Sequence, residues 1–90
     1  MQIEFDSSKR QATLEERDLD MADAAEVFEG EHLTVSDDRF VYGETRNFTI
    51  GFLAGRMVVL AWTPRGEACR IISIRKANDR EQSAYAPRFR

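Results

Sequence analysis

The pattern of hydrophobic and polar residues after residue 31 is typical of β-strands. Residues 32–38 alternate between the two kinds, and residues 46–55, 56–66 and 67–77 are three more strand-like runs. A period of two puts the apolar residues of each strand on one face of a sheet. Gly55 and the Pro64–Gly66 stretch mark tight turns between the last three segments. Strands joined by such short connections are expected to pair as antiparallel neighbours.

The first third of the chain predicts one short strand and two short helices. Residues 2–6 alternate, and their apolar members lie on one face. Asp6 (or Ser7 or Ser8) can cap a helix that follows, because a side-chain oxygen accepts from the free amides of the first turn. Asp20 can cap a second helix over residues 20–30, which Gly30 would end.

A last helix is predicted after residue 77. Asn78 with Glu81 three residues later resembles a capping box, and Pro87 should end or kink the helix. The predicted order is β-α-α-β-β-β-β-α, without an internal repeat. We therefore expect one domain over residues 1–90, of α+β class, with two layers in which an antiparallel sheet packs on helices.

Composition and charge place the chain among small soluble proteins. Hydrophobic residues make up 42% of it and charged residues 32%, and 90 residues suffice for one core. The net charge is −3, yet seven Lys or Arg against three acids lie between Arg65 and Arg90. No apolar run approaches the length of a membrane span, and the N-terminus lacks the apolar core of a signal peptide. A cytoplasmic protein with no membrane partner is expected.

The parity of residues 69–76 indicates where the basic side chains point. Ile72 and Ile74 should face the helices, together with Arg70 and Lys76 at the strand ends. Ser73 and Arg75 would then lie on the open face of the sheet, with Arg65 at its rim. Such a face suits a phosphate, although exposed strand arginines also pair with acids on neighbouring strands. A β-bulge would invert part of this assignment.

Other residues with chemical potential favour structural roles. A single cysteine, Cys69, excludes an internal disulfide and suggests a small, at least half-buried apolar residue. Trp62 shares its strand face with apolar neighbours and is expected in the core, whereas His32 is expected at the surface. One histidine, one cysteine and scattered acids show no metal-ligand spacing, and no glycine-rich phosphate loop is present. The sequence predicts neither a metal nor a cofactor.

Two linked motifs resemble those of the BrnT toxins, the DUF497 family of bacterial type II toxin–antitoxin modules. The similarity runs from Ile3 to about Tyr85. The first motif is "DDR" followed by "YGE" and an arginine, at Asp37, Asp38, Arg39, Tyr42, Gly43, Glu44 and Arg46. The second is "RG…RIIS.RKA…E…Y", at Arg65, Gly66, Arg70, Ile71, Ile72, Ser73, Arg75, Lys76, Ala77, Glu81 and Tyr85.

This resemblance implies a RelE-like fold and a ribonuclease activity that arrests translation. It also implies a BrnA-type antitoxin that covers the toxin and binds DNA, so contact with DNA would be only indirect. Histidines common in the family are absent: Arg17 and Asp18 stand at one such place and Phe40 at another. A non-catalytic protein-interaction module of the same fold is therefore the alternative.

Metal-free cleavage of RNA requires a base for the 2′-hydroxyl and cations for the phosphorane charge. The candidates for charge stabilisation are Arg65, Arg70 and Arg75, and Glu44 is the candidate base. The candidate RNA-binding residues are Arg39, Arg46, Ser73, Lys76 and Tyr85. Glu44 could instead pair with Arg46 or Arg39, and Tyr85 could be a packing residue.

Overall fold

The computed structural model describes residues 2–41 and 44–89, and of residues 38–41 the backbone only. The elements are β1 (Gln2–Glu4), α1 (Ser7–Arg17), α2 (Ala24–Glu29) after a 3₁₀ turn η1 (Met21–Asp23), β2 (Leu33–Val41), β3 (Glu44–Leu53), β4 (Arg56–Arg65), β5 (Ala68–Lys76), α3 (Asp79–Tyr85) and a 3₁₀ turn η2 (Ala86–Phe89). The α+β class is confirmed, and the elements follow one another in the expected order. The likeness to RelE stays a prediction.

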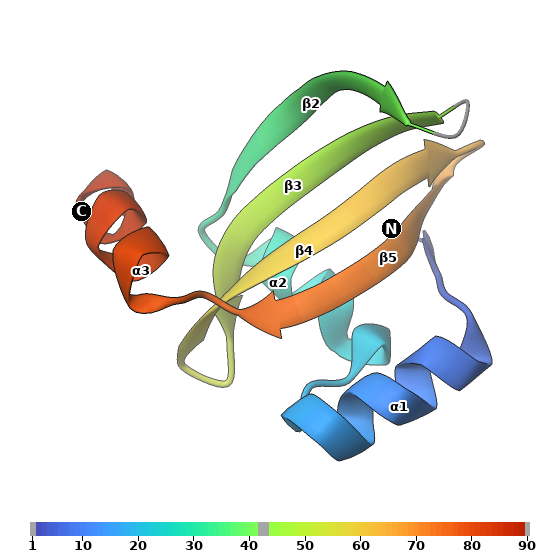
Figure 1. Ribbon diagram of the computed structural model, residues 1–90, viewed down its shortest axis with the longest axis horizontal. Helices are drawn as coiled ribbons and strands as arrows, with labels where there is room; N and C mark the ends of the chain where they lie inside the picture. The colour runs from blue at the N-terminus through green and yellow to red at the C-terminus, as the bar shows by residue number, and fades with distance from the viewer. Residues whose placement is uncertain (1, 42–43, 90) are drawn as a thin grey trace.

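The sheet is mixed, not wholly antiparallel as expected. Its strand order is β1-β5-β4-β3-β2 (Figure 1). Strands β2 to β5 form an antiparallel meander, but β1 lies parallel to β5, with Ile3 opposite Cys69. The expectation rested on short hairpin connections. It fails for β1 because two helices, not a hairpin, follow that strand and leave it free to join the far edge.

Both predicted hairpin turns are present, and their backbone angles explain the glycines. Ala54 and Gly55 have φ values of 53° and 79°, the pair of left-handed residues that a tight two-residue hairpin needs. Gly66, with φ of 61°, serves the turn between β4 and β5. These turns fix the register of β3, β4 and β5.

The helix caps form as the sequence predicts. The Asp6 side chain accepts from the Lys9 amide, and Asp20 accepts from the Ala22 amide. Asp20 also forms a bidentate ion pair with Arg10, whose Nε and Nη2 donate to the two carboxylate oxygens at 2.7 and 2.9 Å. Because Arg10 donates to it, the pKa of Asp20 falls to about 2. This pair ties α1 to the turn before α2.

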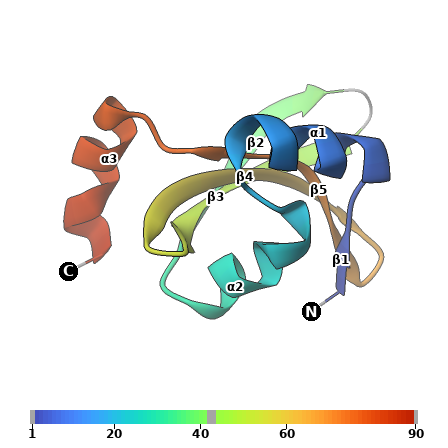
Figure 2. The ribbon, with the colours of Figure 1, turned by 90° about the horizontal axis from the view of Figure 1, so that it is seen from below.

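Each face of the sheet has its own apolar cluster. Helix α2 lies against one of these faces (Figure 2). The face toward α2 carries Leu19, Met21, Ala24, Val27, Leu53, Val58, Leu60, Ile71 and Ile74. The opposite face carries Ile50, Met57, Val59 and Ala77, on which Phe48, Tyr85 and Phe89 pack. The expected two layers therefore gain a partial third one, because α3 and η2 cover one end of the second face.

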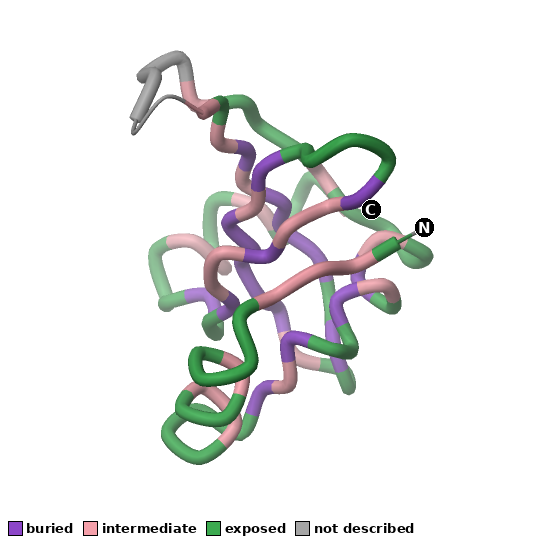
Figure 3. The backbone as a smooth tube through the Cα atoms, turned by 90° about the vertical axis from the view of Figure 1, so that its right-hand side faces the viewer, coloured by how far each residue is buried: buried purple, intermediate pink, exposed green. Residues whose placement is uncertain are grey.

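Glycine allows the close approach of α2 to the sheet. A Cβ added to Gly51 would lie 2.6 Å from Cγ1 of the buried Val27. Helix α1 differs, since none of its residues is buried and its coil is green and pink in Figure 3. It lies beside β5, where Arg17 donates to the Ile74 carbonyl at 3.0 Å. Strand β1 pairs only with residues 68–70 of β5, and Arg17 of α1 binds the backbone of β5 beyond that pairing.

A β-bulge overturns part of the predicted parity of β5. Trp62 pairs with Ile71 and Ala61 with Ser73, so Ile72 is the extra residue. Ile71 and Ile74 are the buried residues that face α2, at 2% and 0% exposure, and Ile72 is only half-buried. The prediction that Ile72 and Arg70 face the helices is wrong, because one inserted residue reverses the alternation.

The expected placements of Trp62, Cys69 and His32 are confirmed. Trp62 packs on the core, edge-on to Phe28, and its Nε1 donates to Thr49 Oγ1 at 2.8 Å. Cys69 is half-buried, and that burial raises the pKa of its thiol. His32 is exposed. In the described ranges, no helix is long and apolar enough to cross a membrane.

Candidate functional site

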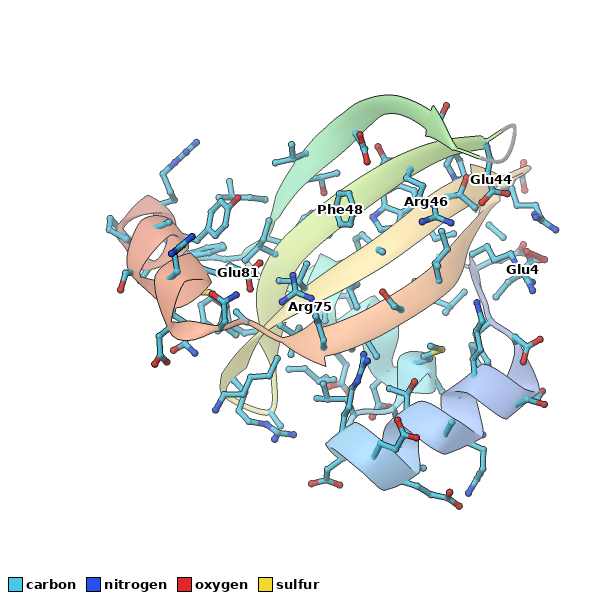
Figure 4. All side chains as sticks on the ribbon, viewed as in Figure 1. Glu4, Glu44, Arg46, Phe48, Arg75 and Glu81 are labelled. Atoms are coloured by element: carbon cyan, nitrogen blue, oxygen red, sulfur yellow. The ribbon has the colours of Figure 1, made fainter. Side chains whose placement is uncertain are left out.

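The candidate site is the face of the sheet that α2 leaves uncovered, here called the open face. It is the face toward the viewer in Figures 1 and 4. Strand register places the following side chains on it: Glu4, Asp37, Glu44, Arg46, Phe48, Ile50, Val59, Ala61, Thr63, Arg65, Arg70, Ser73 and Arg75. Charged side chains gather at its two ends, and apolar ones fill the space beside α3.

One line of charged and polar residues crosses all five strands, and we call it the charged row. Glu4 lies opposite Arg70, Arg70 opposite Thr63, and Asp37 opposite Arg46. One step beyond the pair Asn47 and Trp62, the same register brings Arg46 across from Thr63. Two guanidinium groups thus flank a central threonine, with a carboxylate on the outer side of each. Guanidinium is the cation best suited to phosphate, because it presents a planar fork of donors.

Thr63 fixes the middle of the charged row. It is 2% exposed, and its hydroxyl donates to the Thr45 carbonyl at 2.6 Å. This bond holds β3 and β4 together beyond their last regular pair. The bond therefore ties the backbone next to Arg46 to β4, which pairs in turn with the strand of Arg70.

Glu44 and Arg65 form an ion pair at the same end of the open face. Arg65 Nη2 lies 3.7 Å from Glu44 Oε1, and the side chains are 55% and 32% exposed. The sequence left open that Glu44 forms an ion pair with Arg46 or Arg39. In the structure Glu44 forms an ion pair with Arg65. The long, exposed contact leaves both groups accessible to a ligand.

Glu4 is the carboxylate at the β1 end of the charged row. Its Oε2 is enclosed and has no hydrogen-bond partner in the part of the chain that the structure describes. Enclosing such an oxygen without a partner costs free energy, so most proteins avoid it. The sequence does not indicate Glu4 as a site residue, because the parallel pairing that brings it next to Arg70 joins strands far apart in the chain.

Arg75 lies at the other end of the open face, about 15 Å along β5 from Arg70 at 3.3 Å per residue. Its Nη1 and Nη2 donate to the two Glu81 oxygens at 2.7 and 2.8 Å. The pKa of Glu81 falls to about 2, first because of Arg75 and then because the Asn78 amide also donates to it. Glu81 raises the pKa of Arg75 in turn. The sequence left open that an exposed strand arginine pairs with an acid on a neighbouring strand. Arg75 does pair with an acid, but that acid lies on α3 and not on a strand.

Between Arg75 and α3 lies a pocket of about 160 Å³. Its lining consists of Val35, Phe48, Ile50, Val59, Arg75, Glu81 and Tyr85. Phe48 was missed by the sequence analysis. The alternation of Arg46, Phe48 and Ile50 along β3 could have revealed it, because it puts an aromatic ring directly after a basic residue on one face.

The remaining predicted residues fall in different places. Ser73 is half-buried on the open face, between the charged row and Arg75. Tyr85 lines the pocket and also packs on the second apolar cluster. Lys76 pairs with Val58, so it lies on the face toward α2, away from the other candidates. The side chain of Arg39, like Tyr42 and Gly43, lies outside the described residues.

The arrangement has the components of phosphodiester chemistry. Arginines can hold a phosphate, carboxylates can take a proton from a hydroxyl, and an aromatic pocket lies along the same face. Within residues 2–41 and 44–89, no group of three His, Cys, Asp or Glu side chains could hold a metal ion.

Comparison with known protein families gives a match. A search of curated proteins finds no similar sequence. Residues 5–81, which include most of the open face, match the protein family described as "Ribonuclease toxin, BrnT, of type II toxin-antitoxin system". Since this match covers well over half of the 90 residues, the chain belongs to the BrnT family of ribonuclease toxins.

Proposed function

We propose that the protein is a metal-independent endoribonuclease that cleaves RNA on the open face and so inhibits translation in the cytoplasm. The observation that carries the proposal is the charged row, in which Arg46 and Arg70 flank Thr63 beside the Glu44–Arg65 pair. Family membership supports the ribonuclease activity. The position of the two arginines on one rigid face supports this as the place where RNA binds.

The proposed reaction proceeds through a 2′,3′-cyclic phosphate. Glu44 takes the proton of the 2′-hydroxyl, whose oxygen then attacks the adjacent phosphorus. Arg46 and Arg70 stabilise the charge of the phosphorane, and Arg65, next to Glu44, assists them. The P–O5′ bond breaks, and the departing 5′-oxygen takes a proton from water. Glu4, at the β1 end of the charged row, is the other candidate for the base.

For Arg75 we propose a role other than the charge stabilisation that the sequence suggests. Glu81 occupies its two terminal nitrogens, and the charged row lies at the other end of the strand. We therefore assign Arg75 to positioning the RNA rather than to the phosphorane. Ser73 lies between the charged row and Arg75. It would contact the sugar–phosphate backbone of an RNA that runs from the charged row to Arg75.

The proposed partner is a BrnA-type antitoxin that covers the open face. Occupying the site is the simplest way to silence such a toxin, and a stable complex would bury roughly 1,000 Å² or more. An acidic segment of the antitoxin would complement Arg46, Arg65 and Arg70. High salt should then slow association, whereas a salt-independent rate would indicate a mainly apolar contact.

Growth and cleavage assays with variants of both sheet faces test the proposal. Arg70→Ala and Arg46→Ala should abolish growth arrest and slow cleavage of RNA in EDTA by about 100-fold or more. Lys76→Ala is the matched control, because it removes a basic residue from the opposite face of the same strand. The control should retain the parent's activity. RNA left intact by the parent chain in EDTA, with no growth arrest, would favour the non-catalytic interaction module instead.

A further inference from the structure

The pocket between the sheet and α3 has no part in the reaction proposed above. We infer that it binds a single nucleobase of the RNA, next to the nucleotide that is cleaved. The inference rests on the proposed function for the identity of the ligand as RNA. It adds a base-binding subsite formed by Phe48, Tyr85 and the Arg75–Glu81 pair.

The lining of the pocket suits a flat aromatic ligand. Ile50 and Val59 are almost fully buried, at 3% and 6% exposure, and form an apolar floor. Phe48 on β3 and Tyr85 on α3 contribute aromatic rings from two elements, and no ring contact joins these two described residues. A volume of about 160 Å³ admits one planar ring system but not a folded peptide segment.

The rim of the pocket suits a nucleobase better than an apolar side chain. Arg75 has five N–H donors, and three of those on Nη1 and Nη2 bind Glu81 and the Lys76 carbonyl. Its Nε–H is therefore among the donors that remain for a base edge. Phe48 follows Arg46 on the same face of β3, so the pocket continues directly from the charged row. A strand of RNA held by its phosphates at Arg46 and Arg70 would bring a neighbouring base to Phe48 (Figure 4).

The position of Tyr85, which lines the pocket on the side of α3, depends on Glu81. No residue of α3 is buried, and Tyr85 of α3 and Phe89 of η2 pack on the apolar cluster of the open face. Glu81 caps α3 through the Asn78 amide and binds Arg75 on β5 at the same time. Phe89 stacks edge-on against Phe52 at 5.0 Å and supports the far end. The ion pair thus places Tyr85 across the pocket from the sheet.

The test uses an RNA analogue that cannot be cleaved. An oligonucleotide with a 2′-deoxy residue at the cleaved position and 2-aminopurine as the next base reports stacking through quenched fluorescence. The wild-type chain should quench it, and Phe48→Leu should weaken binding by about 5- to 100-fold, the range for loss of one stacked base. Phe5→Leu is the matched control, because it removes an aromatic ring that packs on the cluster of the opposite face, and it should bind like the parent.

Two further variants keep the outcome interpretable. Phe48→Tyr and Tyr85→Phe retain aromatic rings and should preserve quenching, and thermal melts of every variant verify folding. Equal quenching by Phe48→Leu and the parent would overturn the inference while leaving the proposed cleavage intact. So would a Phe48→Leu variant that loses only antitoxin binding, because the pocket would then hold a protein side chain. Binding is measured without cleavage, so an inactive chain that still quenches would refute the proposed function alone.

Discussion

Replacing Glu81 by glutamine tests how the C-terminal helix is held on the open face. Glutamine at this position can still accept from the Asn78 amide, so the capping box survives. The substitution removes the charge that binds Arg75 through two short hydrogen bonds. Only the link between α3 and β5 is lost, which separates that link from the intrinsic stability of the helix.

The expected loss is about 1 kcal/mol of unfolding free energy. Hydrogen bonds to charged groups contribute about 1.5–3 kcal/mol when shielded, but the Arg75 side chain is 44% exposed and solvent screening reduces the value. For a domain of this size, about 1 kcal/mol corresponds to a fall in melting temperature of about 4–8 °C. Glu67→Gln, at an exposed turn residue, is the control and should melt like the parent.

The effect should also depend on pH in a defined direction. The pKa of folded Glu81, about 2, is lower than its ordinary value of 4.5. The pair therefore stabilises the fold fully above about pH 5 and loses this contribution as the pH falls toward 2. Thermal melts of both proteins between pH 2 and 7 should show a difference that shrinks on acidification. Equal melting at pH 7, or a difference that persists unchanged near pH 2, would refute the assigned role of the pair.

Three other substitutions test the packing. Ile74→Ala should lower the unfolding free energy by about 2–5 kcal/mol in denaturant titrations, whereas Ile72→Ala at the bulge should cost less than half as much; equal losses would contradict the bulge. Gly51→Ala should cost about 1–3 kcal/mol, because its Cβ would meet Val27, and a neutral result would mean that α2 shifts freely. Asp20→Asn should lower the melting temperature at pH 7 but not near pH 2, since the pKa of Asp20 is about 2; a loss that is independent of pH would exclude its ion pair with Arg10 as the cause.

Local signals in the sequence predicted much of the fold. The hairpin turns at Gly55 and Gly66 and the capping box of Asn78 and Glu81 depend on a few adjacent residues, so they can be recognised without the rest of the chain. The parallel pairing of β1 with β5 could not be recognised in this way. It joins residues more than sixty positions apart, and no turn chemistry marks it.

The site was predicted less completely, because parity along a strand is sensitive to a single insertion. The bulge at Ile72 moves Arg70 onto the open face, where it joins Arg46. The pairing of Arg75 with Glu81 depends on how α3 folds back over β5, and the aromatic pocket at Phe48 depends on the same contact. Such features come from tertiary packing, which the order of residues along one strand does not reveal.

Methyl resonances in an NMR titration give the most direct test of the open face as the RNA site. Val58 and Val59 are neighbours on β4, but Val58 faces α2 and Val59 faces the pocket. On addition of an RNA that cannot be cleaved, the methyl signals of Val59 and Val35 should shift, while those of Val58 and Val27 stay in place. Shifts confined to Val58 and Val27 would place the RNA on the opposite face and contradict the proposed site.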